Sequence, residues 1–140
     1  MPLLTWEQKN SVGVRELDDQ HKKLFSIINR LYDSMHTGKD IVELNSVLKE
    51  MIDYADYHFS MEEKYFDLFN FEEKVTHIAK HRAFDKKAAE FMGRNMLGDP
   101  TLSFFVLDFL EDWWLGHINN TDKRYTKCFN DHGLNGAPQK

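Results

Sequence analysis

Seven side chains that can bind metal ions recur along this chain at helical or near-helical spacing. They are five of the seven histidines and two carboxylates: His21, His58, Glu62, His77, His81, His117 and Asp122. The histidines lie on stripes of apolar residues that repeat with the period of a helix, which predicts that they face a core. Because a buried imidazole or carboxylate without a partner is costly, seven such groups need a common explanation. A pair of bound metal ions supplies one.

Two of the spacings suit chelation by a single helix. His58 and Glu62 are four residues apart, about one turn, and therefore share a helix face. His77 and His81 have the same spacing, which places both imidazoles over one ion. Each pair alone has an alternative interpretation as buried residues with hydrogen-bonded partners, but four helices that all carry such groups favour metal binding.

His117 and Asp122 are spaced differently from the other pairs. They are five residues apart, and on a regular α-helix this spacing turns Asp122 away from the direction of His117. If both bind the same ions, the helix must end or be distorted between them. The run Asn119-Asn120-Thr121 is the place where we expect that distortion.

The number of ligands indicates two ions rather than one. Five imidazoles and two carboxylates exceed the four to six ligands of a single ion, and they suit two ions with the carboxylates as bridges. Mixed nitrogen and oxygen donors favour iron, zinc, copper, nickel or manganese over calcium and magnesium. The count leaves at least one ion with an open position, where a small molecule could bind.

The rest of the sequence predicts an all-α, antiparallel, up-down-up-down four-helix bundle with an ordered amino-terminal arm, in a single domain of 140 residues. Apolar stripes mark the helices, and Gly38, Gly98 and the Asp99-Pro100 pair mark the breaks between them. The predicted arm, four helices and tail are, in order, residues 1–17, about 18–37, 41–66, 71–96 and 101–129, and 130–140.

Composition excludes several classes of function. With 18 basic and 23 acidic residues the net charge is −5, and no basic stripe could follow a nucleic acid. No apolar run predicts membrane insertion, and the first residues lack the pattern of a signal peptide. The one cysteine, Cys128, allows neither an internal disulfide nor a cysteine-based metal site. We therefore expect a cytoplasmic protein.

Motifs of other catalytic sites are absent from the sequence. No Glu-x-x-His occurs, which argues against the carboxylate-rich di-iron site of ferritin-like bundles. His-Glu-x-x-His, a Gly-rich phosphate loop and Gly-x-Ser-x-Gly are missing too. The two remaining histidines, His36 and His132, lie off the apolar stripes and are expected to face solvent.

Four segments together make the sequence resemble the hemerythrins, specifically the single-domain bacteriohemerythrins. They are LDDQHKKLF, preceded by Trp6, and then HFSMEE, HIAKH and WWLGHINNTDKRY. The resemblance covers nearly the whole chain. Each segment alone is a weak signal, but all four in this order are highly specific.

The resemblance implies two non-haem iron ions with an oxo or hydroxo bridge, and O2 as a reversible ligand. It implies that one iron is coordinatively full and held by three histidines, His77, His81 and His117. The other iron would be held by His21 and His58 and keep a vacant position for O2. Glu62 and Asp122 would bridge the two ions.

Apolar residues one helical step from these ligands are expected to line the O2 pocket. They are Leu24, Phe25, Ile28, Phe59, Trp113, Trp114 and Ile118. Ordinary core packing is an equally good interpretation of each. Trp114 departs from the family, which usually has leucine at this position, so its indole either fills the pocket or shapes an entrance.

The function that we expect is O2 storage, transport or delivery to an O2-consuming enzyme, by a monomer that is not itself an enzyme. Azide or other small anions should bind at the same open position. The alternatives are a di-iron oxidase, a peroxidase or a nitric-oxide-handling enzyme, for which Tyr125 is a candidate donor. An O2 or iron sensor and an iron reservoir are further alternatives.

Overall fold

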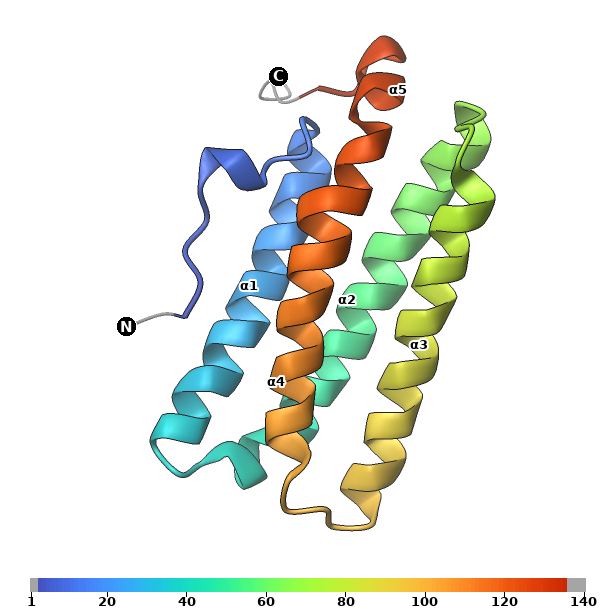
Figure 1. The fold of residues 1–140 in the computed structure, drawn as a ribbon. Helices are drawn as coiled ribbons and strands as arrows, with labels where there is room; N and C mark the ends of the chain where they lie inside the picture. The colour runs from blue at the N-terminus through green and yellow to red at the C-terminus, as the bar shows by residue number, and fades with distance from the viewer. Residues whose placement is uncertain (1–2, 136–140) are drawn as a thin grey trace.

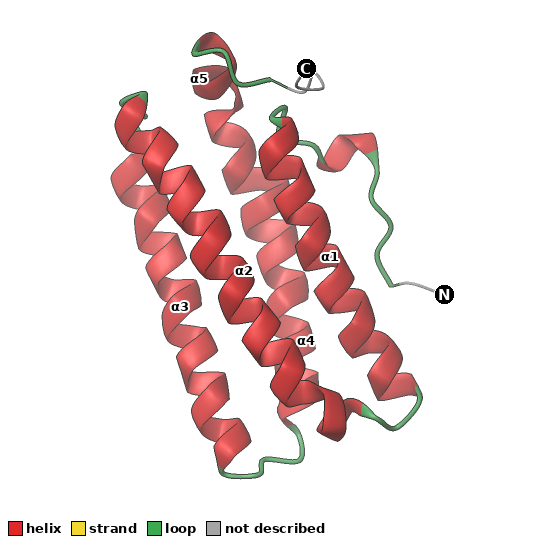
Figure 2. Ribbon diagram, turned by 180° about the vertical axis from the view of Figure 1, so that it is seen from behind, coloured by secondary structure: helices red, strands yellow, loops and turns green. Residues whose placement is uncertain are grey.

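The computed structural model describes residues 3–135 as a bundle of four long antiparallel helices (Figure 1). These are α1 (Arg15–His36), α2 (Asp40–Leu68), α3 (Lys74–Met96) and α4 (Leu102–Trp113). The shorter elements are the 3-10 helices η1 (Gln8–Asn10) and η3 (Asp122–Tyr125), the π-helix η2 (Trp114–Thr121), and α5 (Thr126–Asp131). The described residues contain no strand (Figure 2), and the predicted all-α bundle is confirmed.

Tight turns at the helix ends make neighbouring helices antiparallel. Gly38 ends α1 with a φ of 72°, and Gly98 follows α3 with a φ of 74°, both in the left-handed region that glycine adopts without strain. Beyond Gly38, the Lys39 amide donates to the Ser34 carbonyl at 2.8 Å and closes the helix end. Because these connections are short, each helix runs antiparallel to the one before it.

Several boundaries differ from those that the sequence predicts. α1 begins at Arg15 rather than near residue 18, and α3 begins at Lys74 rather than near residue 71. The later start of α3 has a local cause. Asn70 has a φ of 52° and ends α2 in the left-handed region, and Phe71 then accepts a turn hydrogen bond from Lys74 at 3.2 Å.

The fourth predicted helix, 101–129, is not one continuous α-helix. α4, η2, η3 and α5 follow one another along a single rod (Figure 1), but the hydrogen-bonding pattern changes three times along it. α5 extends to Asp131, and the Asn135 carbonyl accepts a hydrogen bond from the Arg15 amide at 3.0 Å. Residues 136–140 of the predicted tail and 1–2 of the predicted arm lie outside the described residues.

The apolar core consists of two clusters separated along the bundle axis. The larger includes Leu24, Ile28, Phe59, Phe84 and Ile118 and occupies the half near the α1–α2 and α3–α4 turns. The smaller consists of Val12, Val14, Leu17, Phe66, Phe71, Tyr125 and Phe129 at the other end. The seven candidate ligands lie, by position along their helices, between these clusters, which seal them on both sides.

The amino-terminal arm is ordered because it is hydrogen-bonded to α1. The Asn29 side chain donates to the Leu4 carbonyl at 2.8 Å and accepts from the Leu4 amide at 2.7 Å. Two residues after Leu4, Trp6 packs edge-on against Phe25 of α1, with ring centroids 5.4 Å apart. None of the helices in the described part of the chain has the length and apolar character needed to cross a membrane.

Candidate metal centre

All seven predicted ligands lie together in the bundle interior. None of their residues is more than 4% exposed: His21, His58, Glu62, His77, His81, His117 and Asp122. α1, α2 and α3 contribute five of them, η2 contributes His117, and η3 contributes Asp122. The structure thus brings together side chains from every part of the bundle.

The ligating atoms form two groups that share both carboxylates. What we call the three-histidine group consists of Glu62, His77, His81, His117 and Asp122. The two-histidine group consists of His21, His58, Glu62 and Asp122. Within each group, one ligating atom per residue lies within 4.8 Å of all the others, close enough to hold one ion.

Glu62 presents one oxygen to each group. Its Oε1 lies 3.0 Å from His81 Nε2, in the three-histidine group. Its Oε2 lies 3.4 Å from His58 Nε2, in the two-histidine group. A carboxylate whose two oxygens face two separate sets of imidazoles is placed as a bridging ligand.

Asp122 repeats this arrangement from another element. Its Oδ1 lies 2.8 Å from His77 Nε2 and 2.9 Å from His117 Nε2. Its Oδ2 lies 3.0 Å from His21 Nε2. The two carboxylates therefore connect the same two groups.

The π-helix η2 explains how His117 and Asp122 face the same site. It spans Trp114–Thr121, and the Asp122 amide donates to the His117 carbonyl, five residues earlier. In a π-helix, residues five apart lie one above the other, as residues four apart do in an α-helix. The expected distortion between these ligands is present, but it begins at Trp114, before the 119–121 run where the sequence placed it.

Buried polar atoms of the site lack hydrogen-bond partners, although they lie close together. Among the described residues, no hydrogen bond reaches either carboxylate oxygen of Glu62 or Asp122, or the Nε2 atoms of His77, His81 and His117. Lone pairs that converge without hydrogen bonds suit a cation between them, and an uncompensated buried carboxylate costs several kcal/mol. The donor set fits a pair of metal ions.

Charge keeps both carboxylates ionised in the metal-free protein. Burial and Asp122 act to raise the pKa of Glu62, but the facing His58 lowers it far below its usual value. Burial likewise opposes ionisation of Asp122, and His117 and the other imidazoles hold its pKa well below normal. Burial lowers the pKa of His58, but Glu62 and Asp122 outweigh it and raise the value to about 9.

Among the residues predicted to line the pocket, Phe59 and Trp113 contact imidazoles of the site. Leu24, Ile28 and Ile118 are fully buried in the larger apolar cluster. Phe59 stacks on His81 and Trp113 stacks on His117, each with ring centroids 3.9 Å apart, so both contact the three-histidine group. The Phe59 ring also lies 6.0 Å from that of His58, in the two-histidine group.

Trp114 lies in a column of aromatic rings. Its ring is 5.3 Å from that of Phe25, which in turn contacts Trp6 of the arm. The column joins the arm, α1 and η2, and the half-buried indole of Trp114 fills space beside Phe25.

Two buried tyrosines flank the site, and only one was considered from the sequence. Tyr54 stacks on His58 with centroids 5.2 Å apart, and Tyr125 lies 5.8 Å from His77. Neither hydroxyl has a hydrogen-bond partner among the described residues, and burial raises both pKa values well above 10. Tyr54 is four residues before His58, a spacing that could have identified it.

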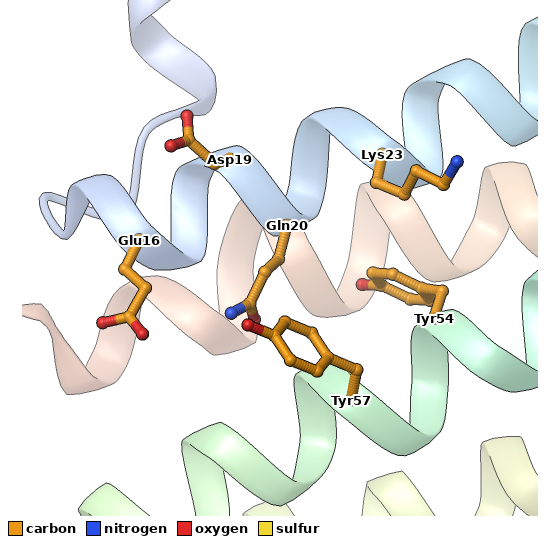
Figure 3. Close-up of a pocket in the computed structure, with 6 residues that line it drawn as sticks. All are labelled: Glu16, Asp19, Gln20, Lys23, Tyr54 and Tyr57. Carbon is orange, nitrogen blue, oxygen red and sulfur yellow. The ribbon is translucent and has the colours of Figure 1, made fainter.

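A surface cavity of about 360 Å³ approaches the site between α1 and α2 (Figure 3). Its lining residues are Glu16, Asp19, Gln20 and Lys23 of α1 and Tyr54 and Tyr57 of α2. Gln20 and Tyr54 both contact His58, so these two side chains separate the cavity from the two-histidine group. His36 and His132 are exposed, as expected, and belong to neither group.

Fold and site together define a metal-binding four-helix bundle protein in which two carboxylates join two sets of imidazoles. Residues 12–128 match the profile of the hemerythrin HHE cation binding domain. A bacteriohemerythrin of Methylococcus capsulatus is 30% identical over 129 residues, 91% of this chain and 98% of the relative. A hemerythrin-like protein of Naegleria gruberi is 32% identical over 120 residues, 86% of this chain and 88% of the relative.

Solved structures agree with these relatives. The crystal structure of a wild-type hemerythrin superposes with a TM-score of 0.78 at 30% identity, covering 90% of this chain and 97% of that one. A leucine-to-alanine variant of a hemerythrin gives a TM-score of 0.79, also at 30% identity, covering 91% of this chain and 98% of that one. The chain belongs to the hemerythrin family.

Proposed function

We propose that this protein binds O2 reversibly at a non-haem di-iron centre. In the proposed centre, His77, His81 and His117 hold one iron, and His21 and His58 hold the other. Glu62 and Asp122 bridge the two irons. The observation that carries the proposal is the placement of both buried carboxylates, each with one oxygen toward each group of imidazoles and no hydrogen-bond partner among the described residues.

The unequal number of imidazoles sets the place of the ligand. With three histidines against two, the iron of the two-histidine group has one protein ligand fewer and keeps a position for O2 or azide. The iron pair, when bound, supplies the electrons that O2 accepts, one from each ion. The two carboxylates offset half of the four positive charges of two Fe(II) ions and keep the buried site from a large net charge.

Exclusion of water and protons favours release of O2 over its consumption. Leu24, Ile28 and Ile118 are fully buried and belong to the larger apolar cluster, on one side of the candidate ligands. The Tyr54 and Tyr125 phenols have pKa values well above 10, so both hold their protons at neutral pH. These features support a carrier that stores O2 or delivers it to an O2-consuming enzyme.

An anaerobic titration of the iron-loaded protein with O2, followed by removal of the gas, tests this proposal. We expect two irons per chain, a visible absorption band that forms with O2, and its loss under vacuum over repeated cycles. Azide should compete with O2. An iron content far from two, or permanent oxidation in the first cycle, would contradict reversible binding.

The second candidate is a di-iron enzyme that reduces O2, peroxide or nitric oxide. The observation in its favour is the pair of tyrosine hydroxyls that lie beside candidate ligands without hydrogen-bond partners among the described residues. Turnover with an added reductant, far above the rate of spontaneous oxidation and lost in Tyr54→Phe or Tyr125→Phe, would favour this function. An iron sensor or an iron reservoir would be favoured if neither O2 binding nor turnover were found.

A further inference from the structure

The Gln20 side chain is hydrogen-bonded to a candidate ligand of the two-histidine group. His58 Nδ1 and Gln20 Oε1 are 2.5 Å apart, and the contact is buried. An amide oxygen only accepts hydrogen bonds, so His58 Nδ1 carries the proton and Nε2 keeps its lone pair for an ion. Gln20, at 8% exposure, thus fixes the ring orientation and the protonated nitrogen of His58.

Met61 determines which way the Gln20 amide points. Gln20 Nε2 donates to the Met61 sulfur at 3.2 Å. A thioether sulfur can only accept, so it takes the NH2 group and leaves the amide oxygen to face His58. α2 therefore supplies both the imidazole and the sulfur that aligns its partner, one turn apart on the same helix.

Glu63 has the corresponding role in the three-histidine group, where it accepts a hydrogen bond from a candidate ligand. Unlike the Gln20 amide, this acceptor is a carboxylate. His81 Nδ1 donates to Glu63 Oε2 at 2.9 Å. The same carboxylate forms an ion pair with Arg82, which is half exposed and holds it in place. His81 is thereby also held with Nε2 free to bind an ion.

The other imidazoles lack comparable partners. The buried Nδ1 atoms of His21 and His117 have no hydrogen-bond partner among the described residues. His77 instead lines a small polar cavity of about 140 Å³. Each group thus has one histidine that a side chain orients, through a neutral amide in one group and a carboxylate in the other.

We propose that Gln20 and Glu63 are positioning residues that make the two metal sites unequal in electron donation. A carboxylate draws the Nδ1 proton more strongly than an amide does, which makes His81 the more basic ligand of the two. An iron bound at the three-histidine group would therefore be stabilised as Fe(III), and the neutral acceptor at His58 would favour Fe(II) at the two-histidine group. The inference rests on the proposed two-metal centre but not on reversible O2 binding.

Substitution of each acceptor by the other tests the inference. Gln20→Glu places a carboxylate behind His58 and should lower the midpoint reduction potential of the iron pair and speed spontaneous oxidation. Glu63→Gln should shift the potential in the opposite direction. Spectroelectrochemical titration of the iron-loaded variants measures both shifts, and circular dichroism establishes that each variant is folded.

Matched controls separate hydrogen bonding from charge alone. Lys23→Gln also lowers the net charge by one at the cavity that Gln20 lines, and Lys23 is not among the residues that form hydrogen bonds with His58. Asp85→Asn removes one negative charge from a residue that pairs with the same Arg82 at 3.2 Å. We expect both controls to shift the potential by much less than the corresponding acceptor variant. Equal shifts would overturn the inference.

A second readout needs no iron. In the zinc-loaded protein, nitrogen-15 NMR of the imidazoles should show a slowly exchanging Nδ1 proton on His58 that is lost in Gln20→Ala. We expect the same variant to weaken binding of one of the two zinc ions by roughly 10–100-fold. If wild-type protein fails to bind two ions, the proposed centre is wrong. If it binds two and Gln20→Ala changes neither signal nor affinity, the role of Gln20 is wrong.

Discussion

His117 Nε2 and Asp122 Oδ1 lie 2.9 Å apart although the two residues are five positions apart in the chain. The π-helix Trp114–Thr121 produces this contact, since its wider turn returns to the same face after five residues rather than four. The α-helix α4 precedes this segment and the 3-10 helix η3 follows it. The local change of helix type therefore brings two ligands from one stretch of chain to the same site.

The π-helix predicts an asymmetry between deletion and insertion. Deletion of the exposed Asn120 would allow a regular α-helix, in which His117 and the aspartate are four residues apart and again share a face. We expect this variant to keep two metal ions per chain. Insertion of one alanine after Asn120 should turn the aspartate and α5 away and lower the metal content. Loss of both ions in the deletion variant would show that the π-helix itself is required.

The bridging geometry predicts that loss of one carboxylate weakens both ions. Asp122 faces His77 and His117 through Oδ1 and His21 through Oδ2, so Asp122→Asn should reduce iron to well below two per chain. His21→Ala removes a ligand from the two-histidine group only and should leave about one iron per chain. Iron analysis after gel filtration measures both, and Asp112→Asn, at an exposed position of α4, is the control. Equal losses in Asp122→Asn and His21→Ala would contradict a bridging role.

Local patterns in the sequence were sufficient to predict the bundle and to select side chains that the structure brings together. Spacings of four residues and apolar stripes act within one helix and are visible without the fold. What they missed depends on distant residues. The partners of Gln20 and Glu63 are 38 and 18 residues away, and Asn70 ends α2 rather than starting the next helix because its backbone is left-handed. The five-residue spacing of His117 and Asp122 indicates a distortion, but it does not show that the π-helix begins as early as Trp114.

The raised pKa of His58 predicts opposite effects of pH on folding and on metal binding. In the metal-free protein, Glu62 and Asp122 outweigh burial and raise this pKa from 6.5 to about 9. A folded-state value above the unfolded one contributes stability that is complete below pH 6.5 and lost as pH rises to about 9. Deprotonation over the same window frees Nε2 for an ion, so metal affinity should rise, by up to about tenfold per pH unit.

Thermal unfolding of the metal-free protein from pH 6.5 to 9 measures how its stability depends on pH. Zinc competition titrations over the same range measure how the metal affinity depends on pH. His36→Gln changes an exposed histidine away from the site and should alter neither. A metal-free protein that gains stability across this range, or a metal affinity independent of pH, would contradict the ion pair between His58 and the two carboxylates.

The aromatic column predicts that Trp114 limits access of small ligands to the open iron. Trp114 packs 5.3 Å from Phe25, which the arm holds through Trp6. Trp114→Leu removes the ring contact and part of the buried surface, at a cost to the free energy of unfolding of about 1–3 kcal/mol. The space left beside Phe25 should let azide bind faster and let the deoxy protein oxidise faster.

Stopped-flow binding of azide to the oxidised, iron-loaded protein measures the first effect. We expect an increase of about tenfold in the association rate for Trp114→Leu, a difference that corresponds to a barrier lowered by about 1.4 kcal/mol. Leu115→Ala is the matched control, because Leu115 is the next residue of the same π-helix but is 54% exposed. An unchanged rate in Trp114→Leu would mean that the indole only fills space, and that ligands reach the iron by another route, for which the cavity at Gln20 and Tyr54 is then the candidate.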